Sequence, residues 1–313
     1  MRGVSRIAAG SLVLVFSAVG LACASSAPRP SAPSPAQTET ASESPKGTLL
    51  IVGGGPIPDA VLDRFVTLAG GRGHARIVIF PMASESADAG LELAEDFRKL
   101  GAEAERIVLT HEEAQAPDAA RRLDGVTGIW FGGGDQSRLT AAIGRTAVET
   151  AIHERYRAGA VVGGTSAGAA VMSTPMLTGD ERHPGGSRPP EKDSNDAFMT
   201  IARDDVVTID GFGLIRGAIV DQHFVRRRRS NRLLSVVLEN PSLVGIGIDE
   251  STALEVPPFG PWKILGDSVA VVFDARVARI TAPSSTLGAS GIRLAVLPTG
   301  SSYDLPTGTA TLP

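Results

Sequence analysis

The sequence predicts an α/β domain in which a mostly parallel β-sheet is sandwiched between helices. Uninterrupted apolar segments alternate with amphipathic helical segments from residue 48 onward. Strands that are apolar at every position are typical of parallel sheets covered on both faces. Hydrophobic residues make up 42% of the 313 residues, and aromatic residues only 4%. The chain is therefore long enough to bury one large core, built mainly from aliphatic side chains.

The predicted elements follow one another in a regular order. We expect strands at residues 48–55, 75–81, 105–110, 127–135 and 160–164, and helices at residues 59–69, 87–102 and 137–160. Two later apolar runs, within residues 219–224 and 245–252, are assigned to further strands of the same sheet. The sequence shows no repeat of fixed period.

Glycine clusters end three of the predicted strands, at residues 53–55, 132–134 and 163–164. Ligands of such sheets bind beyond the carboxyl ends of the strands, so these clusters mark the expected site. Glycine-rich strand ends can also bind phosphate. However, neither G-x-G-x-x-G nor G-x-x-x-x-G-K-[ST] occurs, and a nucleotide site is therefore not expected.

Charge and histidine spacing restrict the ligands further. The formal net charge is −4, which gives no indication of nucleic acid or of an acidic membrane surface as a partner. The five histidines are scattered, and no H-E-x-x-H motif occurs. We therefore expect neither a metal nor a cofactor.

Residues 1–23 are predicted to be a signal peptide. Arg2 and Arg6 precede an apolar run of about a dozen residues, the length of a secretory core and short of the roughly 20 apolar residues of a membrane span. The run ends in Gly-Leu-Ala-Cys at Cys23, which resembles a bacterial lipobox. We therefore expect export to the periplasm or the cell exterior, with a lipid anchor on Cys23. Cleavage by an ordinary signal peptidase after Ala22 or Ala24 is the alternative.

A linker, residues 24–47, separates this signal from the predicted domain, residues 48–313. The linker is rich in Pro, Ser, Ala and Thr and has no apolar periodicity, so it cannot bury a core and is expected to be disordered. Cys23 is the only cysteine of the chain. The domain therefore contains no disulfide and no thiolate nucleophile, which argues against an amidotransferase with a catalytic cysteine.

One serine stands out at the end of the strand predicted at residues 160–164. Gly164-Thr165-Ser166-Ala167-Gly168 fits the G-x-S-x-G pattern, in which a nucleophilic serine occupies a strained strand-to-helix turn between small neighbours. This turn would present the Ser166 hydroxyl at the top of the sheet and direct the Ala167 N–H toward an oxyanion. A glycine-rich helix start with serine as its cap is the alternative.

A nucleophilic serine needs a base and an acid. His223 follows an apolar run, whereas His183 lies in a polar Pro/Gly segment, so His223 is the better candidate base. No histidine follows it in the chain, which argues against the α/β-hydrolase order. Asp249 and Glu250 end another apolar run, and the sequence pattern favours neither as the partner of His223. The alternatives are a structural histidine and two solvated carboxylates.

Five arginines follow His223: Arg226, Arg227, Arg228, Arg229 and Arg232. Guanidinium groups bind carboxylates through two parallel hydrogen bonds, so the cluster indicates a substrate that carries carboxylates. A solvated basic helix face or a phosphate-binding patch would show the same pattern.

Four segments together resemble the cyanophycinase family of serine peptidases, which has a glutamine-amidotransferase-like fold, a flavodoxin-like three-layer arrangement. They are FGGGDQSRL (131–139), GGTSAGAAVM (163–172), DQHFVRRRRSNRLL (221–234) and GIGIDESTALEV (245–256). The resemblance implies a triad of Ser166 as nucleophile, His223 as base and Glu250, rather than Asp249, as the residue that orients His223.

The resemblance also implies a substrate pocket and an oxyanion site. The residues implied to line the pocket are Gln136, Asp221, Arg227, Arg229 and Arg232, with Arg226 and Arg228 facing outward. The oxyanion would accept hydrogen bonds from Ala167 and from a backbone N–H of Gly133, Gly134 or Asp135.

Members of this family hydrolyse cyanophycin, a poly-aspartate backbone with arginine on each side chain, to β-Asp-Arg dipeptides. The free carboxylates of that polymer would meet the arginine cluster, and its guanidinium groups would meet acids such as Asp221. The long polar segment 175–212 is expected to reshape the pocket or to act as a lid. The alternatives are a serine dipeptidase for other aspartyl or isoaspartyl peptides and an inactive ligand-binding lipoprotein. The sequence leaves the oligomeric state open, a homodimer included.

Overall fold

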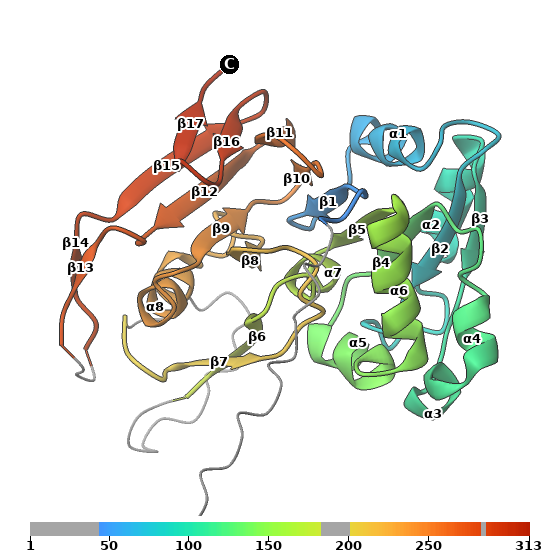
Figure 1. Cartoon of the computed structure of the whole chain (residues 1–313), viewed down its shortest axis with the longest axis horizontal. Coiled ribbons are helices and arrows are strands. Elements are labelled where there is room, and N and C mark those ends of the chain that lie inside the picture. Colours follow the sequence, from blue (N-terminus) through green and yellow to red (C-terminus); the bar gives the residue numbers. More distant parts are fainter. Residues whose placement is uncertain (1–43, 183–200, 283–285) are drawn as a thin grey trace, which may run out of the picture. The chain divides into compact units, whose positions relative to one another are not determined.

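A computed structural model describes residues 44–182, 201–282 and 286–313 of the chain (Figure 1). These described residues form one compact unit. The signal peptide predicted at residues 1–23, its Cys23 and most of the linker lie outside the described residues. The last two linker residues are packed on the domain, because Lys46 and Gly47 donate backbone hydrogen bonds of 3.3 and 3.0 Å to the carbonyls of Arg157 and Tyr156.

The larger sheet has nine strands, and five of them are parallel to one another. Its parallel part contains β1 (Leu49–Val52), β2 (Arg76–Phe80), β3 (Glu103–Arg106), β4 (Gly128–Phe131) and β5 (Val161–Thr165), in the spatial order β1-β5-β4-β2-β3. Beyond β1, the antiparallel strands β10 (Thr252–Val256), β11 (Trp262–Gly266), β16 (Ser302–Asp304) and β17 (Thr309–Thr311) extend the sheet. The predicted α/β fold is confirmed, and four of its five parallel strands lie where the apolar runs place them. The exception is the edge strand β3, a polar segment that shares only residues 105 and 106 with the strand predicted at 105–110.

A second sheet contains the strands expected at residues 219–224 and 245–252, so their assignment to the first sheet was wrong. Its strands are β8 (Ala218–Gln222), β9 (Val244–Ile248), β12 (Val269–Asp274) and β15 (Arg293–Pro298), in the order β15-β12-β9-β8. β8 and β9 are parallel and are joined through helix α8 (Ser230–Glu239). To join the larger sheet, β8 and β9 would have to pair with the edge of β1 that faces away from β5, but β10 already pairs with that edge. The edge of β9 that faces away from β8 pairs with β12.

Helices cover both faces of the parallel strands. One face packs against α1 (Asp59–Leu68) and α2 (Leu91–Lys99). The other packs against α3 (His111–Gln115), α4 (Pro117–Arg121), α5 (Gln136–Ile143), α6 (Ala147–Ala158) and α7 (Ala167–Ala170). The predicted helix 137–160 is therefore two helices. It breaks because Gly144 ends α5, Arg145 has φ 58°, and the Thr146 side chain caps α6 by accepting from the Glu149 N–H.

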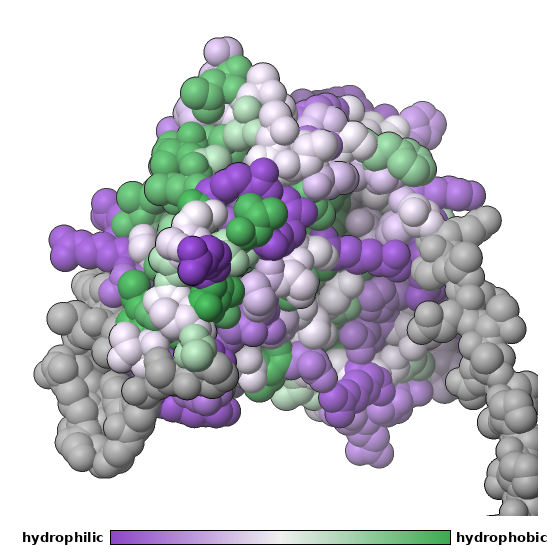
Figure 2. All heavy atoms as spheres, turned by 60° about the vertical axis from the view of Figure 1, so that its left-hand side comes forward, coloured by the Kyte–Doolittle hydropathy of each residue, from purple (hydrophilic) through white to green (hydrophobic). Residues whose placement is uncertain are grey.

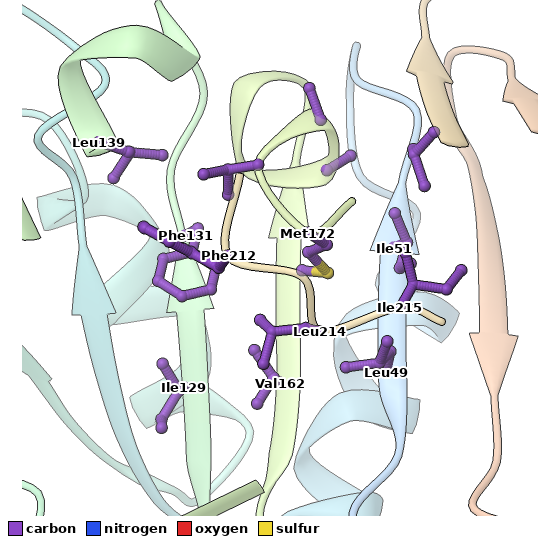
Figure 3. Close-up of a cluster of buried hydrophobic side chains, with 14 of the residues drawn as sticks. Leu49, Ile51, Ile129, Phe131, Leu139, Val162, Met172, Phe212, Leu214 and Ile215 are labelled. Carbon is purple, nitrogen blue, oxygen red and sulfur yellow. The ribbon is translucent and has the colours of Figure 1, made fainter. Parts of the chain in front are cut away.

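Strand β1 shows why the inner parallel strands are largely apolar. Leu49 and Ile51 belong to the core on the α3–α7 face, whereas Leu50 and Val52 belong to the core on the α1–α2 face. Figure 3 shows the first of these cores, where side chains of β1, β4 and β5 meet Met172 and Phe212. Since successive side chains of a strand point to opposite faces, a strand buried on both faces needs an unbroken apolar run.

Two short ladders complete the described fold: β6 (Met176–Glu181) with β7 (Val206–Ile209), and β13 (Arg279–Ile280) with β14 (Ala289–Ser290). The segment 175–212, expected to reshape the pocket or to act as a lid, thus contains the β6–β7 pair. Its residues 183–200 lie outside the described residues.

Apolar side chains reach the surface on the edge strand β15. Leu294 and Val296 are 62% and 53% exposed. Figure 2 brings this side of the molecule forward and shows apolar patches separated by hydrophilic side chains. In the part of the chain that the structure describes, no helix is both long and apolar enough to cross a membrane.

Candidate active site

Ser166 lies in a strained turn between β5 and α7. Its φ of 54° and ψ of −109° belong to a region that L-residues rarely adopt, and its N–H donates to the Val52 carbonyl at 3.0 Å. The turn is tight on both sides. A Cβ at Gly164 would lie 2.5 Å from the Gly168 carbonyl oxygen, and a Cβ at Gly168 would overlap the Phe131 carbonyl. The G-x-S-x-G glycines are thus required by backbone packing.

The structure brings Ser166, His223 and Glu250 together, from segments far apart in sequence. The Ser166 Oγ lies 2.8 Å from His223 Nε2, and His223 Nδ1 lies 2.7 Å from Glu250 Oε1. The side chain of His223 is 8% exposed and that of Glu250 28%. Ser166 follows a strand of the nine-stranded sheet, whereas His223 and Glu250 follow β8 and β9 of the four-stranded sheet. The three groups therefore meet between two sheets and not at the rim of one.

Glycines of the β1–α1 loop join the two sheets at this point. The His223 N–H donates to the Gly53 carbonyl at 2.7 Å, and the Ser251 N–H donates to the Gly54 carbonyl at 2.8 Å. A Cβ at Gly54 would overlap the His223 imidazole, and one at Gly55 would lie 2.9 Å from the Glu250 Cβ. The imidazole of His223 and the side chain of Glu250 thus pack directly against the backbone of Gly54 and Gly55.

Asp249 is placed differently from its neighbour Glu250. Its Oδ1 accepts from the N–H groups of Val225 and Arg226 at 3.1 and 2.9 Å, and its Oδ2 accepts from Ser268 Oγ at 2.9 Å. Asp249 therefore holds the turn that follows His223, while Glu250 contacts the imidazole itself. The geometry therefore distinguishes the roles of the two carboxylates, which the sequence pattern did not.

The surroundings of His223 favour its neutral form. Burial lowers the pKa of the imidazole, the hydrogen bond to Glu250 raises it, and the positive charges of Arg227 and Arg229 lower it; the net shift is downward. A neutral imidazole near pH 7 is able to accept a proton from the Ser166 hydroxyl.

The backbone N–H groups predicted to bind an oxyanion differ in whether they are available. Within the described residues, the N–H groups of Gly133, Gly134 and Ala167 have no hydrogen-bond acceptor. A Cβ on Gly133 would lie 3.5 Å from the Ser166 Cβ, so this residue is next to the serine. The Asp135 N–H instead donates to the Ala83 carbonyl at 2.9 Å, and the Asp135 side chain caps α5. Asp135 is therefore excluded as an oxyanion donor.

Asp221 and Arg232 form a buried ion pair, which corrects the prediction that Asp221 meets substrate guanidinium groups. Their side chains are 1% and 3% exposed. Arg232 Nε donates to Asp221 Oδ2 at 2.8 Å, and Arg232 Nη2 donates to Asp221 Oδ1. A buried carboxylate that is paired through both oxygens has little capacity left for a substrate cation, because breaking such a pair is costly.

Arg229 lies next to this pair. Its Nη1 donates to the backbone carbonyl of Gln222 at 2.8 Å and to the Gln222 side chain, and it lies 3.7 Å from Asp221 Oδ1. Burial, followed by the charge of Arg232, lowers the pKa of Arg229 to about 9. Arg229 thus remains largely cationic at neutral pH but is held in an unfavourable, poorly solvated position that a carboxylate would stabilise.

The remaining predicted pocket residues fall into three groups. Gln136 is buried, and its Nε2 donates to the carbonyls of Leu177 and Thr178 at 2.6 and 2.7 Å, so it holds the start of β6. Arg227 is half-buried, and its side chain has no hydrogen bond within the described residues. Arg226 and Arg228 are exposed, as their predicted outward orientation requires.

In residues 44–182, 201–282 and 286–313, no three His, Cys, Asp or Glu side chains gather closely enough to hold a metal ion. The site itself offers a serine hydroxyl, an imidazole, a carboxylate and backbone N–H groups. A set of groups in this arrangement can perform nucleophilic catalysis by a serine.

Comparison with known proteins identifies the family. The family model described as peptidase family S51 matches residues 49–257. The chain belongs to peptidase family S51. It is therefore a peptidase, and the serine type follows from the family.

Curated relatives and solved structures extend this family assignment. The S51 chain is similar to the cyanophycinase of Synechococcus elongatus, with 32% identity over 84% of this chain and 80% of the relative. It is similar to that of Trichormus variabilis, with 34% identity over 83% and 86%. It is also similar to that of Geminocystis herdmanii, with 31% identity over 84% and 95%. The crystal structure of a peptidase from an acI-B1 Actinobacterium shares the fold, with a TM-score of 0.59 and 23% identity over 83% of this chain and 97% of that chain.

Two residues of this S51 peptidase site escaped the sequence reasoning. Gly54 was noticed as part of a glycine cluster, but its contact with the imidazole depends on the meeting of two sheets. Asp249 was considered only as a rival of Glu250, although its position at the end of a strand was visible. The one sequence signal for the separate role of Asp249 is that successive side chains at the end of a strand point in different directions, so Asp249 and Glu250 have different partners.

Proposed function

We propose that this S51 peptidase is an exported serine exopeptidase that hydrolyses cyanophycin to β-Asp-Arg dipeptides. The observation that carries the proposal is the contact chain from Ser166 through His223 to Glu250, with Arg227 and Arg229 close enough to affect the imidazole. The names of the curated relatives support the substrate. Export rests on the sequence of residues 1–23 alone.

In the first half of the proposed reaction, His223 Nε2 accepts the proton of the Ser166 hydroxyl as Oγ attacks the scissile backbone carbonyl. Glu250 fixes the tautomer that carries its proton on Nδ1 and stabilises the imidazolium. The carbonyl oxygen, on which negative charge develops, accepts hydrogen bonds from the N–H groups of Gly133 and Ala167. The carbon–nitrogen bond then breaks, and the imidazolium returns its proton to the leaving amine.

In the second half, water hydrolyses the acyl-enzyme. His223 removes a proton from the water, the hydroxide adds to the ester carbonyl, and the proton passes to Ser166 Oγ as the ester bond breaks. The base must be neutral in both halves, and burial together with the two nearby arginines supports that state.

The arginines after β8 suit the carboxylates of the polymer. Each arginine of cyanophycin carries a free α-carboxylate, and a guanidinium group binds a carboxylate through two hydrogen bonds. Arg227 has a side chain with no partner within the described residues, and Arg229 is desolvated. A substrate carboxylate would provide the acceptor for one and the counter-charge for the other.

Substitution of the nucleophile tests the proposal. The wild-type protein should release β-Asp-Arg from cyanophycin granules, identified by product mass, and Ser166→Ala should lower kcat by about 10⁶-fold while the polymer still binds. Unchanged turnover in Ser166→Ala would reject the mechanism. Cleavage of short α-aspartyl or isoaspartyl peptides with no release from the polymer would identify a dipeptidase instead. Polymer binding without any turnover by the wild type would identify an inactive binding protein.

A further inference from the structure

A cavity of about 430 Å³ adjoins Ser166 on the α1–α2 face of the larger sheet. Its floor contains Gly132, Gly133 and Thr165, at the carboxyl ends of β4 and β5. Gly133 also borders the Ser166 side chain, so the cavity and the nucleophile share a wall. The volume lies within the roughly 300–1,000 Å³ of small-molecule sites.

The walls of this cavity are aliphatic, and its charged residues are acidic. Ile57, Ile79 and Leu93 are among the apolar lining residues, and α2 contributes Glu92 and Asp96. Among the residues that the structure describes around the cavity, none is lysine, arginine or histidine. The two carboxylates are four residues apart and so lie on the same side of α2.

The polar groups of the cavity differ in how they are satisfied. Asp96 accepts a hydrogen bond of 2.8 Å from Lys99 Nζ. Glu92, in contrast, makes no hydrogen bond or ion pair with any residue of the described ranges. At the floor, the Thr165 Oγ1 is buried and has no partner among those residues. A ligand that combines an apolar stem with hydrogen-bond donors and a positive charge would complement all of these features.

We propose that this cavity is the subsite for the arginyl side chain of the substrate, with its methylene stem against the aliphatic walls and its guanidinium on Glu92. The inference rests on the proposed function and gives the guanidinium a different partner from Asp221, which is committed to Arg232. Carboxylates and guanidinium groups of one substrate are then recognised by different elements: the arginines after β8 and an acid of α2.

Paired substrates and paired variants test this subsite. The substrates are a dimer of β-Asp-Arg and the same dimer with citrulline in place of arginine, which keeps the shape and removes the charge. The wild type should prefer the arginine dimer by about tenfold in kcat/KM. Glu92→Gln should bring the ratio close to one, mainly by raising KM for the arginine dimer, and Glu92→Lys should reverse it.

Glu95→Gln is the matched control, because Glu95 lies on the same helix, pairs with Arg98 and does not line the cavity. It should keep the wild-type preference. The inference is wrong if Glu92→Gln keeps that preference, or if Glu95→Gln lowers it equally. The proposed function fails separately if the wild type cleaves neither dimer and no polymer, or if Ser166→Ala remains active.

Discussion

The nucleophile side and the base side of this active site are constructed in different ways. Ser166 is fixed by local backbone geometry, with glycines on either side of one turn and a hydrogen bond to β1. His223 and Glu250 are fixed by contacts between two sheets, where the β8 and β9 ends meet the glycines after β1. A turn of five residues can be recognised in a sequence, whereas the meeting of two sheets cannot.

The two sides also differ in charge. The nucleophile side offers backbone N–H groups and a cavity with carboxylates, while the base side contains Arg227, Arg229 and the buried Asp221–Arg232 pair. The site therefore presents opposite charges to two parts of one ligand. This arrangement suits a zwitterionic substrate better than a simple anion or cation.

The largest effect on the base side is expected from Glu250→Gln. The amide keeps the shape of Glu250 but can donate to Nδ1 and so select the wrong tautomer of His223, and kcat should fall by about 10³–10⁴-fold. Steady-state kinetics would measure it. Asp249→Asn is the control, since the amide oxygen still accepts from Val225 and Arg226; its kcat should fall less than about tenfold. An equal loss in both variants would mean that Glu250 does not orient the imidazole.

Glycine substitutions should separate the two sides. At Gly168 a methyl group would meet the Phe131 backbone, which cannot move without disturbing β4, so Gly168→Ala should lower the free energy of unfolding by about 1–3 kcal/mol. At Gly54 the methyl group would meet the His223 ring, which can rotate away, so Gly54→Ala should lower kcat by about 10²-fold.

Thermal denaturation and steady-state kinetics on both variants would check this difference. Gly54 has a φ of 106°, which an alanine rarely adopts, so Gly54→Ala should also melt below the wild type. What distinguishes it is a loss of kcat that persists at a temperature where both variants are folded. If instead Gly54→Ala loses only stability and keeps full activity, His223 is not held by the backbone of the β1–α1 loop.

The sequence predicted those parts of the structure that depend on neighbours in the chain. Four of the five parallel strands could be predicted in place because both their faces are buried, whereas the polar edge strand β3 was predicted two residues too late. The Ser166 turn could be predicted because its glycines lie within five residues of one another. Strands β8 and β9 were predicted as strands, but they were assigned to the wrong sheet. Their apolar pattern is the same as that of β1, and only the occupation of β1's edge by β10 decides which sheet they join.

Charge was harder to interpret than apolar pattern. Asp221 and Arg232 were expected in an open pocket, yet they neutralise each other in the interior. The Asp135 N–H was expected to donate to an oxyanion, yet it donates to the Ala83 carbonyl. Sequence shows that a charged or polar group exists, but burial and partner choice depend on segments far away in the chain. Glu92 was not predicted as a site residue for the same reason, because its position beside the cavity depends on segments far away in the chain.

The smallest expected effect concerns the pH dependence of the base. The Arg227 charge lowers the pKa of His223, because it disfavours the imidazolium. Since the neutral imidazole is the active form, kcat/KM should fall as the pH drops through this pKa, below the ordinary value near 6.5. Arg227→Gln removes one positive charge, so the pKa rises and the acid limb should move to higher pH, by less than about one unit.

Arg226→Gln is the matched control for this shift. Arg226 is exposed and is not among the main causes of the pKa shift of His223, so the acid limb of Arg226→Gln should stay close to the wild-type position. The pH profiles of kcat/KM should be recorded at low ionic strength, where screening is weakest. An acid limb that moves to lower pH in Arg227→Gln, or that moves equally in Arg226→Gln, would show that the base is tuned by burial and Glu250 rather than by the arginine beside it.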